Sequence, residues 1–315
     1  MDRVSEVEDL VQSCEGNLIG DMVALMRQYC AVYYPECALG TAIFVLGTVG
    51  QRALLFPRGH THGHHFIVGP SNCGKNDYLE VGRKLIDGVD HRLILADPSS
   101  GKNLKAGLSV FPSRCWIADE AGQLLRDGCD PKSRNEHAKS LLNLFLSLWG
   151  GMSVLPASGG QAEGVRTPRT PLPKWSVLGS TTRHGLNYLY EKCPAYGDGG
   201  HMSRNVVWEV CKSKRSEYQH IAAPKKDFSQ ICTKLKAIFR TGMIFNGMRL
   251  RPEDEGGAEV DWPEEPTQAI EWANEAALTY FCRQWGVIGS AADHTDLAGE
   301  DARPCHRARG RRQTR

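Results

Sequence analysis

The chain has 315 residues, of which 41% are hydrophobic and 23% are charged, so it can bury a sizeable core in one large or two modest domains. Its formal net charge at pH 7 is only +2, which excludes an overall basic field as the source of nucleic-acid affinity and leaves that role to local clusters. The number of cysteines is 11 and no secretory signal opens the chain, so we expect reduced, mostly buried thiols in a cytoplasmic protein.

The first predicted elements are two helices within residues 1–56. Apolar side chains recur at helical spacing from Asn17 until Pro35 interrupts the pattern, because proline favours extended backbone before it. A second, almost entirely apolar helix is expected over residues 37–54. Its longest apolar run, residues 37–50, is too short to span a bilayer. The sequence therefore predicts an N-terminal helical hairpin and no contact with a membrane.

Four histidines, His60, His62, His64 and His65, crowd the segment before the next predicted strand. Histidines in alternation could bind a transition metal. Neither a cysteine nor a carboxylate nearby completes such a site. We therefore favour a pH-sensitive surface loop and keep metal binding as the alternative.

A glycine loop follows a short apolar strand over residues 66–68. Gly69 to Lys75 fits the pattern Gly-x-x-x-x-Gly-Lys, and helical spacing resumes over residues 78–87. Backbone N–H groups of such a loop, together with a helix N-terminus, form a cradle for phosphate oxygens. Lys75 would reach the β- and γ-phosphates of a nucleotide. The predicted nucleotide-binding residues are Gly69, Pro70, Ser71, Asn72, Cys73, Gly74, Lys75 and Asn76.

Asn76 departs from the usual pattern. Serine or threonine normally stands at this position and places a hydroxyl on Mg²⁺. The amide oxygen of Asn76 can also bind a hard cation, but this side chain is longer and bulkier. We therefore expect nucleotide binding to survive better than hydrolysis.

An acidic motif follows further along the chain. Residues 92–96 predict a strand, residues 97–101 a turn that can cap a helix, and residues 102–110 that helix. Residues 115–118 then form an apolar strand that ends in Asp119 and Glu120. In phosphate-loop ATPases an aspartate at this place holds Mg²⁺ and a glutamate polarises the attacking water. Asp119 and Asn76 are thus the candidate metal ligands; the alternative is an acidic pair on a solvated loop.

The alternation of strands and helices continues with an amphipathic helix over residues 137–149. Such alternation is typical of a parallel sheet with helices on both faces. The predicted fold is α/β, with a phosphate-loop NTPase core over residues 57–215. Within this core, residues 150–174 lose periodicity and carry Arg166, Arg169 and Lys174. This leaves open a mobile loop or a contact with a nucleic-acid backbone.

The last predicted core strand covers residues 175–183 and ends in hydroxyl side chains, where a polar group can sense the γ-phosphate. Gly199 and Gly200 then precede Arg204 and an apolar alternation over residues 206–208. A guanidinium that leaves a glycine turn at the edge of the core could reach the nucleotide of a neighbouring subunit and stabilise transition-state charge. A surface arginine is the alternative.

The remaining sequence predicts a C-terminal helical region over residues 216–288. Helices are expected over residues 228–239 and 267–285, with an acidic linker rich in glycine and proline over residues 253–265. Residues 289–315 are rich in arginine and lack apolar partners, so we expect a disordered basic tail. The loss of pattern there also suggests a truncated chain.

Four stretches in this order resemble a known family: Gly-Pro-Ser-Asn-Cys-Gly-Lys, Trp-Ile-Ala-Asp-Glu-Ala-Gly, Val-Leu-Gly-Ser-Thr-Thr and Gly-His-Met-Ser-Arg-Asn. The family comprises phage- and prophage-borne phosphate-loop ATPases, catalogued as a domain of unknown function and often described as primase- or replicative-helicase-like. The resemblance covers residues 17–208. It implies the following roles: Lys75 binds phosphate, Asp119 binds Mg²⁺, Glu120 acts as the base, Thr181 as the sensor and Arg204 as a finger in trans.

The resemblance implies a helicase-like motor in mobile-element DNA replication. Such a protein would form a homo-oligomeric ring on single- or double-stranded DNA, use ATP and Mg²⁺, and work with a primase as a candidate partner. The alternative is a nucleotide-dependent DNA-binding or assembly module in which Asn76 has weakened hydrolysis. A third hypothesis is a nonfunctional fragment of a mobile element.

Overall fold

In the computed structural model the chain divides into two compact units, Met1–Ile270 and Glu271–Arg315. The structure describes residues 3–51, 63–149, 173–193, 196, 200–210 and 227–245, together with the pairs 154–155, 158–159, 166–167 and 170–171. All of these residues belong to the first unit. The predicted linker over residues 253–265, the helix over residues 267–285 and the basic tail over residues 289–315 lie outside the described residues.

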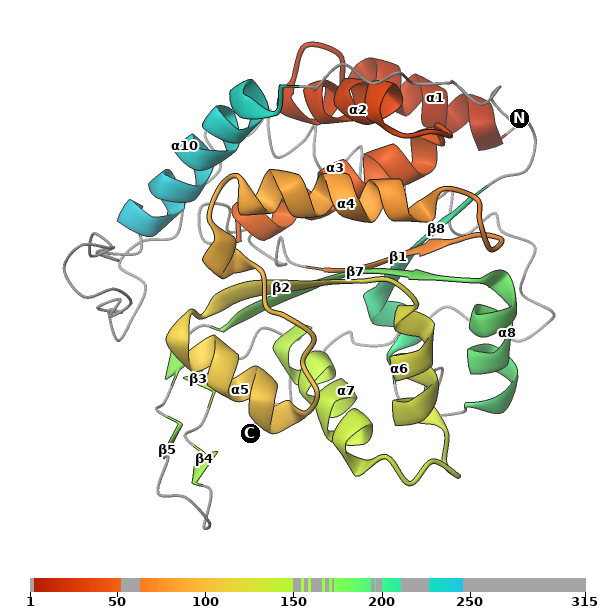
Figure 1. Cartoon of the computed structure of the whole chain (residues 1–315), viewed down its shortest axis with the longest axis vertical. Coiled ribbons are helices and arrows are strands. Elements are labelled where there is room, and N and C mark those ends of the chain that lie inside the picture. The colour runs from red at the N-terminus through yellow and green to blue at the C-terminus, as the bar shows by residue number, and fades with distance from the viewer. Residues whose placement is uncertain are drawn as a thin grey trace, which may run out of the picture. The chain divides into compact units, whose positions relative to one another are not determined.

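A four-stranded parallel sheet, in the order β2-β7-β1-β8, forms the centre of the first unit (Figure 1). Its strands are β1 (His64–Val68), β2 (Ser113–Ala118), β7 (Lys174–Thr181) and β8 (Asn205–Glu209). Val68 lies beside Thr181 on one side and Glu209 on the other, so the carboxyl ends of these strands share one edge of the sheet. The prediction of an α/β fold with a parallel sheet flanked by helices is confirmed.

The predicted strand over residues 92–96 is wrong for most of its length. His91–Leu93 form a short 3-10 helix, η1, and only Ile94 makes a parallel bridge, to Cys115. The reason lies in Asp90, whose carboxylate accepts a hydrogen bond from the Arg92 backbone N–H at 2.9 Å. The same carboxylate pairs with the Arg92 guanidinium at 2.6 Å. These contacts turn the chain before it can extend along β2.

The prediction of a surface histidine loop is also wrong for two of its four members. His64 and His65 are the first residues of β1 and are buried, because β1 lies between β7 and β8. Burial lowers the pKa of His64 to about 3 and that of His65 to about 4. Trp208 Nε1 donates to His65 Nδ1 at 3.1 Å. His60 and His62 lie outside the described residues.

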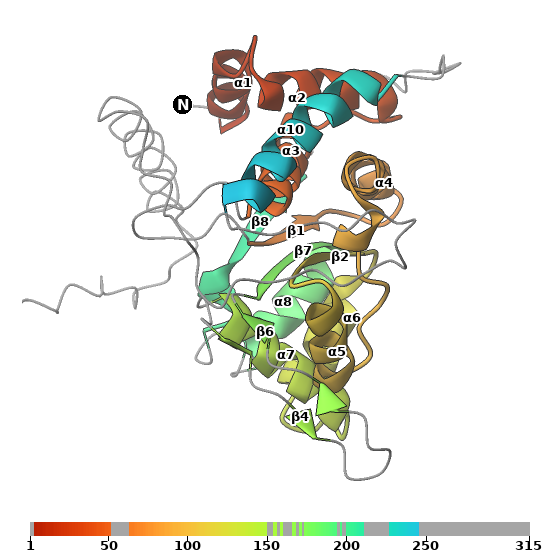
Figure 2. The same ribbon diagram turned by 90° about the vertical axis from the view of Figure 1, so that its left-hand side faces the viewer.

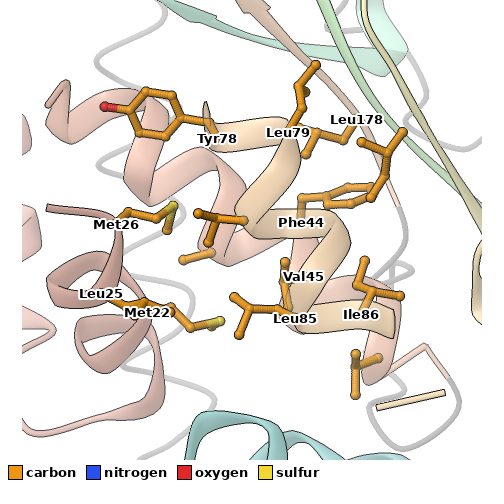
Figure 3. Close-up of a cluster of buried hydrophobic side chains, with 14 of the residues drawn as sticks. Met22, Leu25, Met26, Phe44, Val45, Tyr78, Leu79, Leu85, Ile86 and Leu178 are labelled. Atoms are coloured by element: carbon orange, nitrogen blue, oxygen red, sulfur yellow. The ribbon is translucent and has the colours of Figure 1, made fainter. Parts of the chain in front are cut away.

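Four helices lie on one side of the sheet (Figures 1 and 2). They are α2 (Leu18–Tyr29), α3 (Pro35–Val49), α4 (Lys75–Asp87) and α10 (Ser229–Phe245). Helices α3 and α4 lie directly on the face of the sheet, and α2 and α10 pack against these two. Asn17 starts α2 by accepting hydrogen bonds from two backbone N–H groups, and Pro35 begins α3, where its fixed φ suits a first helical turn. In Figure 3, side chains from α2, α3 and α4 meet Leu178 of β7 in a common apolar core. A further helix, α1 (Arg3–Ser13), contacts α2 and α3.

Helix α10 packs closely against the C-terminal turn of α4. Cys232 Sγ lies 3.9 Å from the carbonyl oxygen of Leu85, and a Cβ added to Gly88 would come within 2.6 Å of the same sulfur. Lys84 Nζ donates to the Tyr29 hydroxyl at 2.6 Å, and the Phe228 ring lies edge-on to Tyr29 with 5.8 Å between centroids. Helices α2, α4 and α10 are therefore tied together at this point.

The other face of the sheet carries the second half of the core (Figure 1). Its helices are α5 (Gly101–Val110), α6 (Ala121–Cys129), α7 (Glu136–Trp149) and α8 (Arg183–Lys192). The Ser100 hydroxyl caps α5, as the turn at residues 97–101 predicts. The Phe145 ring of α7 packs against the Trp175 ring of β7 in a tilted arrangement, with 5.5 Å between ring centroids. An aromatic pair of this kind is worth about 0.5–1.5 kcal/mol beyond the burial of its area.

Two short antiparallel strand pairs lie in the predicted irregular segment over residues 150–174. They are β3 (Val154–Leu155) with β6 (Thr170–Pro171), and β4 (Ser158–Gly159) with β5 (Arg166–Thr167). Strands of two residues produce no recognisable period in a sequence, which is why the pattern there predicts only a loop. The choice between a mobile loop and a nucleic-acid contact stays a prediction.

Two expectations from composition can be compared with the described part of the chain. Its cysteines are free thiols, and six of them are buried: Cys30, Cys37, Cys115, Cys129, Cys193 and Cys232. Within the same residues, no helix is both long and apolar enough to cross a membrane.

Candidate functional site

Three turns at the carboxyl edge of the sheet surround a cavity of about 460 Å³. The first turn connects β1 to α4, the second β2 to α6 and the third β7 to α8. Because β7 lies between β1 and β2, the first two turns face each other across the third. Open α/β sheets bind ligands at this edge, beyond the carboxyl ends of their strands.

Most of the residues predicted from the two motifs line this cavity. The glycine loop contributes residues 71–76, the acidic strand contributes Asp119 and Glu120, and β7 contributes Thr181. Gly69 and Pro70, at the start of the loop, do not line it but accept hydrogen bonds from the lysine that does. The structure thus brings together two sequence motifs that lie far apart along the chain.

The glycine loop turns sharply into the first residue of α4. Gly74 has a φ of 85° and Asn72 a φ of 57°, a region that glycine enters without steric cost and asparagine enters more readily than most residues. Lys75 is the first residue of α4 and only 8% exposed. Its Nζ donates to the carbonyl oxygens of Gly69 at 3.1 Å and Pro70 at 2.6 Å. The lysine amine therefore lies against the loop and within the cavity wall.

Asp119 is the most heavily hydrogen-bonded carboxylate of the site. One oxygen accepts from Asn76 Nδ2 at 2.9 Å, and the other accepts from the Ser180 hydroxyl at 2.5 Å and the Glu120 backbone N–H at 2.9 Å. Burial raises the pKa of Asp119, but these three donors and the nearby charge of Lys75 outweigh it and leave the pKa below its usual value. Asp119 is therefore ionised at neutral pH.

Glu120 is fixed through its backbone N–H, which donates to the Asp119 carboxylate at 2.9 Å. It precedes α6 with a φ of 53°, a left-handed conformation that costs a non-glycine residue about 1–2 kcal/mol. Its side chain is exposed and lines the cavity beside Asp119. Strained residues of this kind cluster at functional sites, where the surrounding structure fixes them.

Two hydroxyl side chains, Ser180 and Thr181, end β7 beside the acidic pair. Ser180 joins Asp119, as described above, and Thr181 is 7% exposed. A Cβ on Gly122 would lie 2.2 Å from Thr181 Oγ1, and one on Gly185 would lie 2.8 Å from it. Helices α6 and α8 can approach this hydroxyl only because both positions are glycine. Thr182 caps α8 by accepting from the Gly185 N–H at 3.1 Å.

Seven cavity residues are not among the site residues predicted from the sequence. They are Gly122, Gln123, Arg126, Ser180, Thr182, His184 and Gly185. Ser180 lies in the run of hydroxyl side chains that was recognised only as a group. Gln123 and Arg126 lie on the helix that follows the acidic pair, and helical spacing from Gly122 places Arg126 on the same face. That spacing is the signal that could have found Arg126.

Arg204 lies away from the cavity within this chain. It immediately precedes β8, and β8 starts beside His64, the first residue of β1. Arg204 is therefore at the amino-terminal edge of the sheet, whereas the cavity is at the carboxyl edge. Its Nη1 donates to the Gly200 carbonyl oxygen at 2.6 Å, and its guanidinium lies 5.4 Å from the centroid of the Trp149 ring. A role toward the nucleotide of another subunit stays a prediction.

The donor set suits a magnesium ion better than a transition metal. Across the described residues, no group of three or more His, Cys, Asp or Glu side chains could hold a metal ion. Mg²⁺ needs fewer protein ligands, because it keeps several waters and is bound through one or two carboxylates together with phosphate oxygens. Asp119, with Asn76 beside it, offers such a set.

Comparison with known proteins adds no family to these observations. No protein-family model matches the chain, and no curated protein matches it significantly.

Proposed function

We propose that the chain is a phosphate-loop protein that binds ATP with Mg²⁺ in this cavity and hydrolyses it. The observation that carries the proposal is the 2.9 Å hydrogen bond from Asn76 to Asp119. It joins the first turn of the helix after the glycine loop to the end of the acidic strand, across 43 positions of sequence. A chance match to either pattern gives no reason for the two to meet.

The predicted residues that line the cavity have chemical roles that their positions support. The backbone N–H groups at the start of α4 would bind phosphate oxygens, and Lys75 would exchange its two carbonyl partners for the β- and γ-phosphates. Asp119 and Asn76 would hold Mg²⁺, which supplies neutralisation of phosphate charge when bound. Glu120, exposed in the cavity, would orient and polarise the attacking water. Thr181 would sense the γ-phosphate from the end of β7.

The wider role rests on the sequence resemblance. We propose a helicase-like motor of mobile-element DNA replication, in which copies of the chain assemble into a ring on DNA and Arg204 of one copy reaches the nucleotide of the next. To do so, Arg204 has to leave the Gly200 carbonyl and the Trp149 ring. Its guanidinium would then stabilise transition-state charge from outside the subunit that binds the nucleotide.

One observation favours a second function, a nucleotide-dependent DNA-binding or assembly module with little hydrolysis. Asn76 uses its amide nitrogen to bind Asp119, so the residue that replaces the usual hydroxyl is held by the carboxylate that it would join in binding Mg²⁺. Such a contact would slow metal-assisted chemistry more than it would weaken binding of the nucleotide. DNA binding would then depend on whether ATP occupies the cavity and not on hydrolysis of the ATP.

Two measurements on the full chain test the proposal: calorimetry with ATP and Mg²⁺, and phosphate release with and without single-stranded DNA. Lys75→Ala is expected to abolish binding, because it removes the principal cation for the phosphates. Glu120→Gln is expected to bind ATP and lose turnover by at least about 100-fold, the usual scale of general-base catalysis. DNA-stimulated release by the unmodified chain supports the motor, and tight binding without release supports the module.

Two surface residues of α7 supply matched controls. Lys139 pairs with Glu136 at 2.9 Å and neither lines the cavity. Lys139→Ala and Glu136→Gln repeat the two chemical changes away from the site and should leave binding and turnover as they were. No heat on mixing ATP and Mg²⁺ with the unmodified chain would refute the proposed function.

A further inference from the structure

The cavity contains a second cation that no motif indicates, Arg126 of α6. Gly122 and Arg126 are four residues apart, so they share one face of the helix, and Gln123 lies next to Gly122 at the edge of that face; all three line the cavity. This face begins directly after Asp119 and Glu120. Helix α6 is thus the wall of the cavity opposite the glycine loop.

The guanidinium of Arg126 is held in a defined position. Gln123 Nε2 donates to Asp127 Oδ1 at 2.7 Å, which turns the amide so that its oxygen accepts from Arg126 Nη2. The guanidinium carbon lies 5.8 Å from the centroid of the Tyr188 ring on α8. The neighbouring helix and a fixed amide therefore restrict the arginine, so binding an anion would cost it little conformational freedom.

The hydrogen bonds that the structure gives Arg126 leave part of its fork without an acceptor. Within the described chain, its Nε is shielded from solvent and has no hydrogen-bond partner, and the arginine forms no ion pair with any described carboxylate. A buried N–H without an acceptor is unfavourable. Because Nε is out of reach of solvent where it lies, an anionic oxygen in the cavity would bind the terminal Nη groups of the arginine rather than Nε. The guanidinium matches phosphate oxygens in geometry as well as charge.

The arrangement of the sheet indicates which phosphate Arg126 would meet. Lys75 and the loop N–H groups extend from the β1 side, whereas Arg126 extends from the β2 side, with the end of β7 between them. A phosphate chain held by the loop would run past Asp119 and end on the α6 side. There the last phosphate of a triphosphate would bring further negative charge close to the carboxylates of Asp119 and Glu120. Without Arg126, Lys75 would be the one lysine or arginine among the described residues of the cavity to offset that repulsion.

We propose that Arg126 binds the terminal phosphate of a nucleoside triphosphate in the same chain and so makes the cavity select triphosphate over diphosphate. This inference rests on the proposed function, because it needs a nucleotide in the cavity. It assigns the discriminating cation to α6, independently of any contribution from Arg204 of a second copy. Gln123, held by Asp127, is the positioning residue for this arginine.

Equilibrium binding of ATP·Mg²⁺ and of ADP·Mg²⁺ to the full chain tests the proposal. For Arg126→Ala we expect ATP affinity to fall by about 10- to 100-fold, the scale of a lost charge-assisted hydrogen bond, and ADP affinity to change by less than about 3-fold. Arg126→Lys keeps the charge but loses the fork, so it should recover part of the ATP affinity. Arg134→Ala removes an exposed arginine outside the cavity and should change neither affinity.

The outcomes separate this inference from the function on which it rests. If the unmodified chain binds neither nucleotide, the proposed function fails and the inference falls with it. If the unmodified chain binds ATP but Arg126→Ala weakens ATP and ADP equally, or weakens neither, Arg126 is not the discriminating cation. Thermal unfolding of Arg126→Ala by circular dichroism, compared with Arg126→Lys, shows whether an equal loss for both nucleotides comes from a damaged fold.

Discussion

At the scale of single residues, Asn76 is the position on which the proposed hydrolysis depends most. It occupies the first turn of α4, where a hydroxyl would bind Mg²⁺, and its amide instead donates to Asp119. The departure from the usual residue was evident from the sequence. Its engagement with Asp119 was not, because a contact across 43 positions depends on how the sheet brings β1 and β2 to one edge.

We expect Asn76→Ser to raise ATP turnover several-fold, by about 3- to 10-fold at saturating ATP, because a hydroxyl is a shorter metal ligand and frees Asp119. ATP affinity should change much less than kcat. Phosphate release measured beside the unmodified chain checks this, with Lys75→Ala introduced in both backgrounds to measure contaminating activity. An unchanged or lower kcat would show that Asn76 does not limit the reaction.

At the scale of elements, the order of strands and helices could be predicted wherever an element is long and regular. The strand, glycine loop and helix at residues 66–87 and the acidic strand ending at Asp119 were predicted because their patterns combine apolar runs with distinctive polar residues. The turn at His91–Leu93 was missed because a single carboxylate, that of Asp90, redirects an apolar stretch that otherwise favours a strand. Local capping outweighs strand propensity there.

Gly40 on α3 shows how closely one element can constrain another. A Cβ at this position would lie 2.5 Å from the Trp208 ring of β8, so we expect Gly40→Ala to lower the free energy of unfolding by about 1–3 kcal/mol through overpacking. The helix propensity of alanine offsets about 1 kcal/mol of the strain. Urea denaturation followed by circular dichroism measures the loss.

The same substitution on α4 is the control. A Cβ on Gly82 would meet the ends of the Leu178, Thr41 and Val45 side chains, at 3.2, 3.3 and 3.9 Å, and a shift of a few tenths of an ångström would relieve the two closer contacts. Gly82→Ala should therefore lie within about 1 kcal/mol of the unmodified chain. Equal losses for the two variants would contradict the assigned contact with Trp208.

At the scale of the whole molecule, buried histidines make the fold sensitive to acid. Burial lowers the pKa of His64 to about 3, of His65 to about 4 and of His201 to about 4. The unfolded chain binds these protons at its ordinary pKa near 6.5, so the histidine contribution to stability is complete above about pH 6.5 and is lost as the pH falls toward 4. Each histidine contributes a slope of about 1.4 kcal/mol per pH unit in that window.

We therefore expect the free energy of unfolding to fall steeply between about pH 6.5 and 5, where most carboxylates of ordinary pKa are still ionised. His65→Gln should reduce the slope of unfolding free energy against pH by the contribution of one histidine, about 1.4 kcal/mol per pH unit. His137→Gln, a change of an exposed histidine on α7, should leave the slope unaltered. Urea unfolding at a series of pH values measures all three chains, and equal slopes for His65→Gln and the unmodified chain would contradict burial of a neutral His65.

The site as a whole could be predicted only in the parts that carry sequence motifs. The loop residues and the acidic pair were found because phosphate and metal chemistry demand particular residue types in a fixed order. Arg126 and Ser180 reach the same cavity from α6 and β7, and ordinary residues of this kind gain a role only through the packing of three turns. Burial of His64 and His65 could not be predicted, because the polarity of histidine favours the surface.

Helix α4 has one end at the cavity and the other against α10. Lys75 is its first residue, and Leu85, near its C-terminal end, lies under Cys232. An α-helix of this length is a stiff rod of about 20 Å, and the space between Gly88 and Cys232 is too small to absorb a displacement. If Lys75 leaves its carbonyl partners for a ligand and α4 moves with it as a rigid body, α10 must move as well. A change at the cavity would then displace a helix that does not line the cavity.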